Sequence, residues 1–115
     1  MKLKLISFDR VSAVLLAVAL VLNAGAWAVI LWKLPYTSDP VFLHYNIYFG
    51  IDLTGSWYEL LWIPGSGLAA LVINSVIIVL NKRMDAVVRI SSMAVTASFQ
   101  AILLLASVLV VLLNK

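Results

Sequence analysis

The sequence contains no cysteine, a single histidine and few charged residues. It is 115 residues long, and Asp, Glu, Lys and Arg together make up 11% of it. Soluble domains usually carry about 25% charged residues, so the composition excludes an ordinary soluble domain. The lack of cysteine excludes disulfides, thiolate nucleophiles and thiolate metal sites. A zinc site takes about three or four protein ligands, and no second histidine is present to complete one.

Hydrophobic residues are abundant and make up 64% of the chain. Three windows hold no charged side chain: Val11–Trp32, Leu60–Asn81 and Ile90–Asn114, which are 22, 22 and 25 residues long. A helix needs roughly 20 apolar residues to cross a hydrocarbon layer about 30 Å thick. The sequence therefore predicts an all-α membrane protein, a single unit over residues 1–115, with three transmembrane helices at 11–34, 60–81 and 86–113.

The first apolar segment also resembles a secretory leader. Basic residues precede it, and Ala24-Gly25-Ala26 is similar to a small-residue cleavage site. Leader cores usually end after about 7–15 apolar residues, whereas this run continues through Trp27 to Trp32. We therefore expect an uncleaved first span.

Basic residues are divided unevenly between the two sides of the predicted bundle. Six precede the first span or lie between the second and third: Lys2, Lys4, Arg10, Lys82, Arg83 and Arg89. Only Lys33 and Lys115 lie on the other side. The positive-inside rule predicts a multi-pass protein of the cell membrane with a cytoplasmic N-terminus, an outer C-terminus and an outward loop at 35–56. Basic residues scattered at span boundaries favour membrane anchoring over nucleic-acid binding.

The second span has a recognisable beginning. Ser56-Trp57-Tyr58-Glu59 fits the S-x-x-E capping box, in which the Ser and Glu side chains satisfy each other's backbone donors. We interpret Glu59 as this cap rather than as a catalytic carboxylate. Pro64 cannot donate a backbone hydrogen bond, so we expect a kink there and a short interfacial turn ahead of the main span.

The third span is predicted to start at Asp85. This carboxylate can cap the helix and pair with Arg89 four residues later. Only a few residues separate the second and third spans, so these two are predicted to form an antiparallel hairpin.

Three strong hydrogen-bonding side chains lie within the spans: Asn23, Asn74 and Gln100. At about 1.5 Å per residue, Asn23 and Gln100 lie within about 2 Å of mid-membrane and Asn74 about 6 Å nearer the cytoplasm. Small and hydroxyl residues share their helix faces, which favours close packing and hydrogen bonds between helices. We expect all three to meet in one layer. A transport path is the alternative, although ion relays generally need ionisable groups inside the membrane.

The outward loop is longer than the roughly 2–8 residues that join neighbouring helices. Apolar and aromatic residues occupy its odd positions from 41 to 51: Val41, Leu43, Tyr45, Ile47, Phe49 and Ile51. Period two predicts an extended strand with one buried face. We expect an ordered lid whose odd-numbered face packs on the outer helix ends, with His44 and Asp52 close together across a turn at Gly50.

Several short motifs of this loop occur in a fixed order. They are Pro35, Leu43-His44-Tyr45-Asn46, Gly50-x-Asp52 and Gly55-Ser56-Trp57. Together they resemble the motif of the domain of unknown function DUF1648, which lies outside the membrane between the first two helices. The resemblance implies an uncharacterised small membrane protein of the bacterial inner membrane, distantly similar to immunity and signalling proteins of the SdpI type. It implies no settled activity.

Five loop residues are candidates for contacting a partner: Phe42, His44, Asn46, Tyr48 and Asp52. His44, Asn46 and Asp52 could tie the loop's own backbone together, and this interpretation is favoured over a metal site or a catalytic base. Thr54 and Ser56 are the nearby hydroxyls that catalysis would need, and Ser56 is already interpreted as a cap. We expect no catalytic, cofactor-binding or metal-binding residue.

The sequence therefore predicts a non-enzymatic accessory, structural or sensing component. Its expected partners are the lipid bilayer and either another membrane protein or a second copy of the chain. One alternative is an immunity-like or receptor-like protein that binds a peptide at the outer face. Another is a small transporter or channel subunit.

Overall fold

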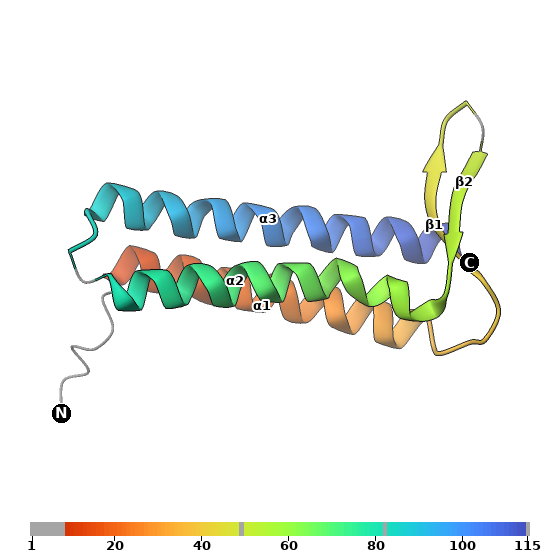
Figure 1. Cartoon of the computed structure of the whole chain (residues 1–115), viewed down its shortest axis with the longest axis horizontal. Coiled ribbons are helices and arrows are strands. Elements are labelled where there is room, and N and C mark those ends of the chain that lie inside the picture. Colours follow the sequence, from red (N-terminus) through yellow and green to blue (C-terminus); the bar gives the residue numbers. More distant parts are fainter. Residues whose placement is uncertain (1–8, 49, 82, 115) are drawn as a thin grey trace.

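The computed structural model describes residues 9–48, 50–81 and 83–114. Three helices run side by side: α1 (Arg10–Lys33), α2 (Trp62–Leu80) and α3 (Ala86–Leu113). Two strands, β1 (Val41–Asn46) and β2 (Gly50–Gly55), and a 3₁₀ helix, η1 (Trp57–Leu61), lie between α1 and α2. Helices α1 and α3 run in the same direction, and α2 runs opposite to both (Figure 1).

The helices have the length and surface of membrane spans. Arg10–Lys33, Trp57–Leu80 and Ala86–Leu113 contain 24, 24 and 28 residues, and only 22%, 22% and 33% of their most apolar windows are buried inside the molecule. The remaining apolar surface faces outward, where bilayer hydrocarbon is the solvent that tolerates it. These features are those of a multi-pass membrane protein, as the sequence predicts.

The start of each of the first two spans is set by local chemistry. Asp9 is the N-cap of α1, and its carboxylate accepts the Ser12 N–H at 3.0 Å. At η1 the Glu59 carboxylate accepts the Ser56 N–H at 3.1 Å, which forms the reverse half of the predicted capping box. The expected short turn before the main span is therefore present as η1.

Pro64 does not interrupt a continuous helix. It is the third residue of α2, because the chain changes from the 3₁₀ helix to the α-helix at Trp62. The first turn of a helix has backbone donors without intrahelical partners, so a missing N–H costs little there. The change of helix type therefore lies at Trp62, two residues before the position at which the sequence predicted a kink.

The helices do not pack mainly against their neighbours in sequence. Helices α2 and α3 are antiparallel, as predicted, but the most extensive contact joins α1 and α3. At their common end, Arg89 lies against Asp9 of α1, with 3.7 Å between Nε and Oδ1, rather than pairing with Asp85. Hydrogen bonding from Ser12, together with the positive charge of Arg89, lowers the pKa of Asp9 below its usual value.

The segment between α1 and α2 is a β-hairpin, so the fold is mostly helical with a small two-stranded sheet rather than all-α. The predicted extended segment over 41–51 is divided into two strands, and the expected turn at Gly50 is present. Strands β1 and β2 are antiparallel, with Val41 opposite Gly55 and Asn46 opposite Gly50, and the register is irregular around His44. Gly50 has a φ of 77°, a conformation that glycine adopts without strain. The period-two pattern continues through both strands, so alternation alone did not reveal the reversal.

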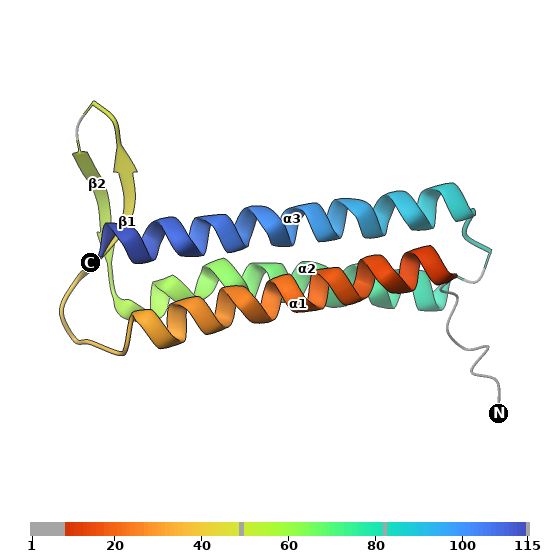
Figure 2. The same cartoon turned by 180° about the vertical axis from the view of Figure 1, so that it is seen from behind.

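The hairpin lies across the end of the bundle rather than along it. Its base is beside the C-terminal end of α3, and its tip projects sideways past α3 in both opposed views (Figures 1 and 2). The link between α2 and α3 and the start of α1 lie at the opposite end of the bundle.

Candidate functional site

A buried polar contact joins all three helices inside the bundle. The Asn23 amide of α1 donates to Gln100 Oε1 of α3 and to the Pro64 carbonyl of α2, each at 3.0 Å. The Gln100 amide donates in turn to the Gly67 carbonyl at 2.8 Å. Asn23 and Gln100 are 4% and 0% exposed, so these bonds are shielded from the bilayer. Two of the three residues predicted to share a polar layer do meet.

Gly67 makes this contact sterically possible. A Cβ at this position would lie 2.5 Å from Gln100 Oε1, 2.6 Å from Leu103 Cδ1 and 3.0 Å from Asn23 Nδ2. Glycine therefore allows the two side chains to reach the α2 backbone, as small residues do at membrane helix contacts. Gly65, two residues earlier, has open space where its Cβ would be.

Asn74 lies apart from this layer. Its amide donates to Thr96 Oγ1 at 2.6 Å, and the Thr96 hydroxyl donates to the Ser92 carbonyl at 2.8 Å. Asn74 follows Gly67 by two helical turns, about 10 Å along α2. The expectation that Asn74 shares the layer of Asn23 and Gln100 is therefore not met, and Asn74 makes a second polar contact between α2 and α3.

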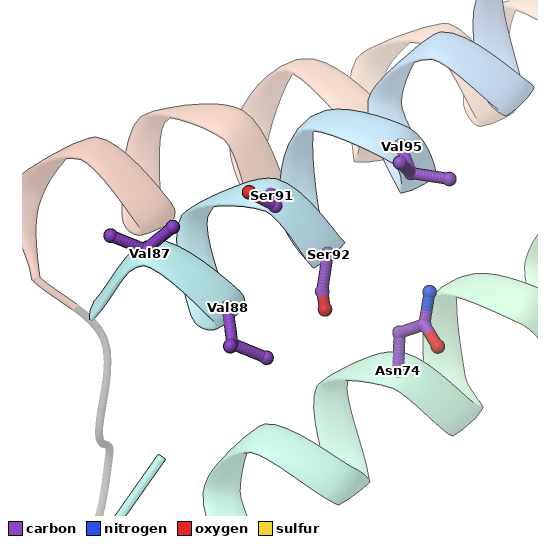
Figure 3. Close-up of a pocket in the computed structure, with 6 residues that line it drawn as sticks. All are labelled: Asn74, Val87, Val88, Ser91, Ser92 and Val95. Atoms are coloured by element: carbon purple, nitrogen blue, oxygen red, sulfur yellow. The ribbon is translucent and has the colours of Figure 1, made fainter. Parts of the chain in front are cut away.

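An open groove of about 390 Å³ lies beside this second contact, between α2 and α3 (Figure 3). Its wall is formed by Asn74, Val87, Val88, Ser91, Ser92 and Val95. Figure 3 shows the side chains of Asn74 and Ser92 pointing toward each other across the gap. The groove is shallow and mostly apolar, and it has none of the ionisable groups that would support catalysis or ion relay.

An apolar cluster fixes the hairpin base to the opposite end of the bundle. Its buried members come from four elements: Ile30 of α1, Val41 of β1, Leu60 of η1 and Val110 of α3. Trp57 packs against this cluster, and its indole N–H donates to the Leu34 carbonyl at 2.8 Å. The end of α1 and the start of the second span are thus held together where the hairpin begins.

Asn114 clamps the backbone of β1 at Phe42. Its Oδ1 accepts the Phe42 N–H at 2.8 Å, and its Nδ2 donates to the Phe42 carbonyl at 2.7 Å. The same amide nitrogen donates to the Val110 carbonyl at 2.9 Å, so one side chain caps α3 and pairs with a strand. Sequence reasoning missed this residue, because an asparagine after an apolar helix indicates only a helix end.

Aromatic side chains surround this end of the molecule. Tyr36, Trp57 and Tyr58 form a cluster with ring centroids 5.4–5.6 Å apart. Trp32 and Trp62 are exposed nearby in sequence, and Lys33 Nζ lies 4.2 Å from the Trp32 ring centroid. Exposed Trp and Tyr at the ends of spans are typical of the membrane–water interface.

The predicted lid is present only in part. Val41 is buried and Leu43 is partly buried against the apolar cluster at the hairpin base, whereas Ile47 is 81% exposed at the hairpin tip. Among the candidate contact residues, Phe42 and Tyr48 are exposed. The side chains of His44, Asn46 and Asp52 lie outside the described part of the structure, and so does the expected contact between His44 and Asp52.

Within the described residues, no group of three or more His, Cys, Asp or Glu side chains could hold a metal ion. Comparisons of the chain with models of protein families, with curated proteins and with solved structures found no significant match. Two features define the candidate site. One is the buried polar contact inside the bundle, and the other is the aromatic end of the molecule, where Asn114 holds the hairpin.

Proposed function

We propose that this chain is a non-enzymatic accessory, structural or sensing component that contacts another membrane protein through its hairpin end. The observation that carries the proposal is the division of roles among its polar and aromatic residues. Asn23 and Gln100 are used inside the bundle, where they bond helix to helix. Tyr36, Tyr58 and Trp62, by contrast, are exposed at the hairpin end. Aromatic residues of this kind are enriched in protein interfaces.

The orientation is part of the same proposal, with the hairpin outside and the N-terminus in the cytoplasm. Arg10, Arg83 and Arg89 lie at the end of the bundle that is opposite the hairpin. The positive-inside rule favours the cytoplasm for that end. Membership of a DUF1648-like group in the bacterial inner membrane is proposed with it, and the motif residues of the 35–57 segment support it.

A peptide-binding role at the outer face is the second candidate. It is favoured by the two-stranded sheet, because an extended peptide can add to a free strand edge through main-chain hydrogen bonds. A transport role has less support, because the buried amides are bonded to one another and to backbone carbonyls.

Comparative co-purification tests the proposal. The wild type, a Tyr36→Ser/Tyr58→Ser variant and a Val87→Ser control would be extracted in mild detergent, and co-purifying membrane proteins would be identified by mass spectrometry. The proposal predicts a partner that the wild type and the control retain and the tyrosine variant loses. A partner that is equally bound by the tyrosine variant would contradict it, and so would the absence of any membrane protein above background.

A further inference from the structure

The hairpin is held at a fixed angle to the spans. Its base is anchored by the Asn114 bonds to Phe42 and by Val41 in the outer apolar cluster. From that base it runs across the helix ends, and its tip passes beyond the edge of α3 (Figures 1 and 2). A hairpin that leaves the bundle in this direction extends over the space beside α3. Around a membrane span this space is filled by lipid.

Large apolar side chains are exposed on the hairpin, among the residues whose side chains the structure describes. Ile47 is 81% exposed, Tyr48 is 86% exposed and Leu53 is 53% exposed. Residues 41–55 contain a single charged residue, Asp52, and no lysine or arginine. Strand edges that face water are usually protected by charged residues, lysine above all. This hairpin lacks that protection at its projecting tip.

The level of the hairpin matches the membrane–water interface. It lies at the ends of the helices that also carry the exposed rings of Trp32 and Trp62. Near the same end α3 exposes Leu109 and Leu112, so an apolar exterior reaches the hairpin base. The interface is hydrated enough to satisfy strand backbone groups, and amphipathic segments there bury their apolar side chains at the headgroup–acyl boundary.

We propose that the hairpin is a membrane-surface element that lies flat on the outer leaflet and inserts Ile47 and Tyr48 among the lipid headgroups. Its ligand is the surface of the phospholipid bilayer. The base of the hairpin, anchored by Asn114 and Val41, sets the depth of the tip. This proposal does not depend on the identity of a protein partner.

Site-directed spin labelling tests the proposal directly, because the chain has no native cysteine. Ile47→Cys and, as a matched control on the preceding loop, Ser38→Cys would be labelled and placed in phosphatidylcholine nanodiscs that hold one copy each. Both positions are exposed, so neither substitution removes buried contacts. Collision of the label with oxygen, which partitions into lipid, would be compared with collision with a water-soluble nickel chelate.

The proposal predicts that the oxygen-to-nickel collision ratio is several-fold higher at position 47 than at position 38. Equal nickel accessibility at the two positions would overturn it, because the tip would then stand in water. The same labels in liposomes at high protein density distinguish a second copy. If position 47 is protected from nickel only there, with spin–spin broadening, the tip is covered by another chain and the lipid proposal is wrong.

Discussion

The side chain of Asn114 occupies the place of a neighbouring strand beside Phe42, accepting its N–H and donating to its carbonyl across 72 residues of sequence. This relationship converts a two-stranded hairpin, which is marginally stable alone, into a rigid extension of α3. The residue that caps α3 thereby also anchors the base of the hairpin.

Replacing Asn114 with Ala should free the hairpin base while leaving the bundle folded. The variant loses three side-chain hydrogen bonds, each of which contributes about 0.5–1.5 kcal/mol in typical cases. Amide hydrogen exchange at Phe42 should accelerate strongly, whereas exchange in the middle of α3 should change little. Asn81→Ala, at the exposed end of α2, is the matched control and should leave Phe42 protected. Unchanged exchange at Phe42 in the Asn114 variant would show that the clamp does not hold the strand.

A methyl group at position 67 should destabilise the bundle. The Cβ of Gly67→Ala would collide with Gln100 and Leu103, and overpacking of this kind typically costs about 1–3 kcal/mol. Gly65→Ala places the same methyl group in open space, so it should be neutral or slightly stabilising. The measurement is the free energy of unfolding in mixed detergent micelles. Equal effects of the two substitutions would mean that α2 does not approach α1 and α3 closely at Gly67.

The amide pair should show energetic coupling. Asn23→Leu and Gln100→Leu should each destabilise the bundle by about 0.6–1.7 kcal/mol, the range of interhelical hydrogen bonds in membranes. The double variant should lose less than the sum, because both substitutions remove the same bond. Asn23→Leu combined with Asn74→Leu should be additive, because Asn74 bonds to Thr96 instead. Additive behaviour of the Asn23 and Gln100 substitutions would contradict the observed pairing.

Acid should weaken the contact between the starts of α1 and α3. The pKa of Asp9 is lowered below its usual value of 3.8, so its stabilising effect is fully present above that pH. As the pH falls below 3.8 toward the folded-state pKa, the unfolded chain takes up the proton first and the stabilisation is lost. Asp9→Asn should remove this part of the pH dependence of the unfolding free energy. If acid lowered the unfolding free energy of that variant by the same amount, Asp9 would not be the group responsible.

The spans and the inner amide pair were predictable from the sequence because both depend on position along a helix. Charge-free windows set the lengths, and depth in the membrane aligned Asn23 with Gln100. Asn74 was misplaced because sequence gives depth more readily than it gives the neighbour that a side chain reaches. The Asn74 amide bonds to the Thr96 hydroxyl rather than to Asn23 or Gln100.

The structure of the hairpin end was less predictable, because its contacts join residues that are far apart in the sequence. The alternation over residues 41–51 fits one strand as well as two strands with a turn, and the antiparallel pairing, which ends at Asn46 and Gly50, distinguishes them. The clamp by Asn114 joins segments that are 72 residues apart, and it has no local pattern. Ile47 is exposed because it lies at the turn of the hairpin, between β1 and β2.

We propose that the three spans place the hairpin outside the cell and the α2–α3 link in the cytoplasm. Labelling of single cysteines introduced at Ser38 and Asp85 with a membrane-impermeant thiol reagent on intact cells tests it most directly. We expect that Ser38→Cys is labelled from outside and that Asp85→Cys reacts only after the membrane is permeabilised. Labelling of position 85, but not position 38, on intact cells would contradict the orientation, and labelling of both would contradict the three-span arrangement.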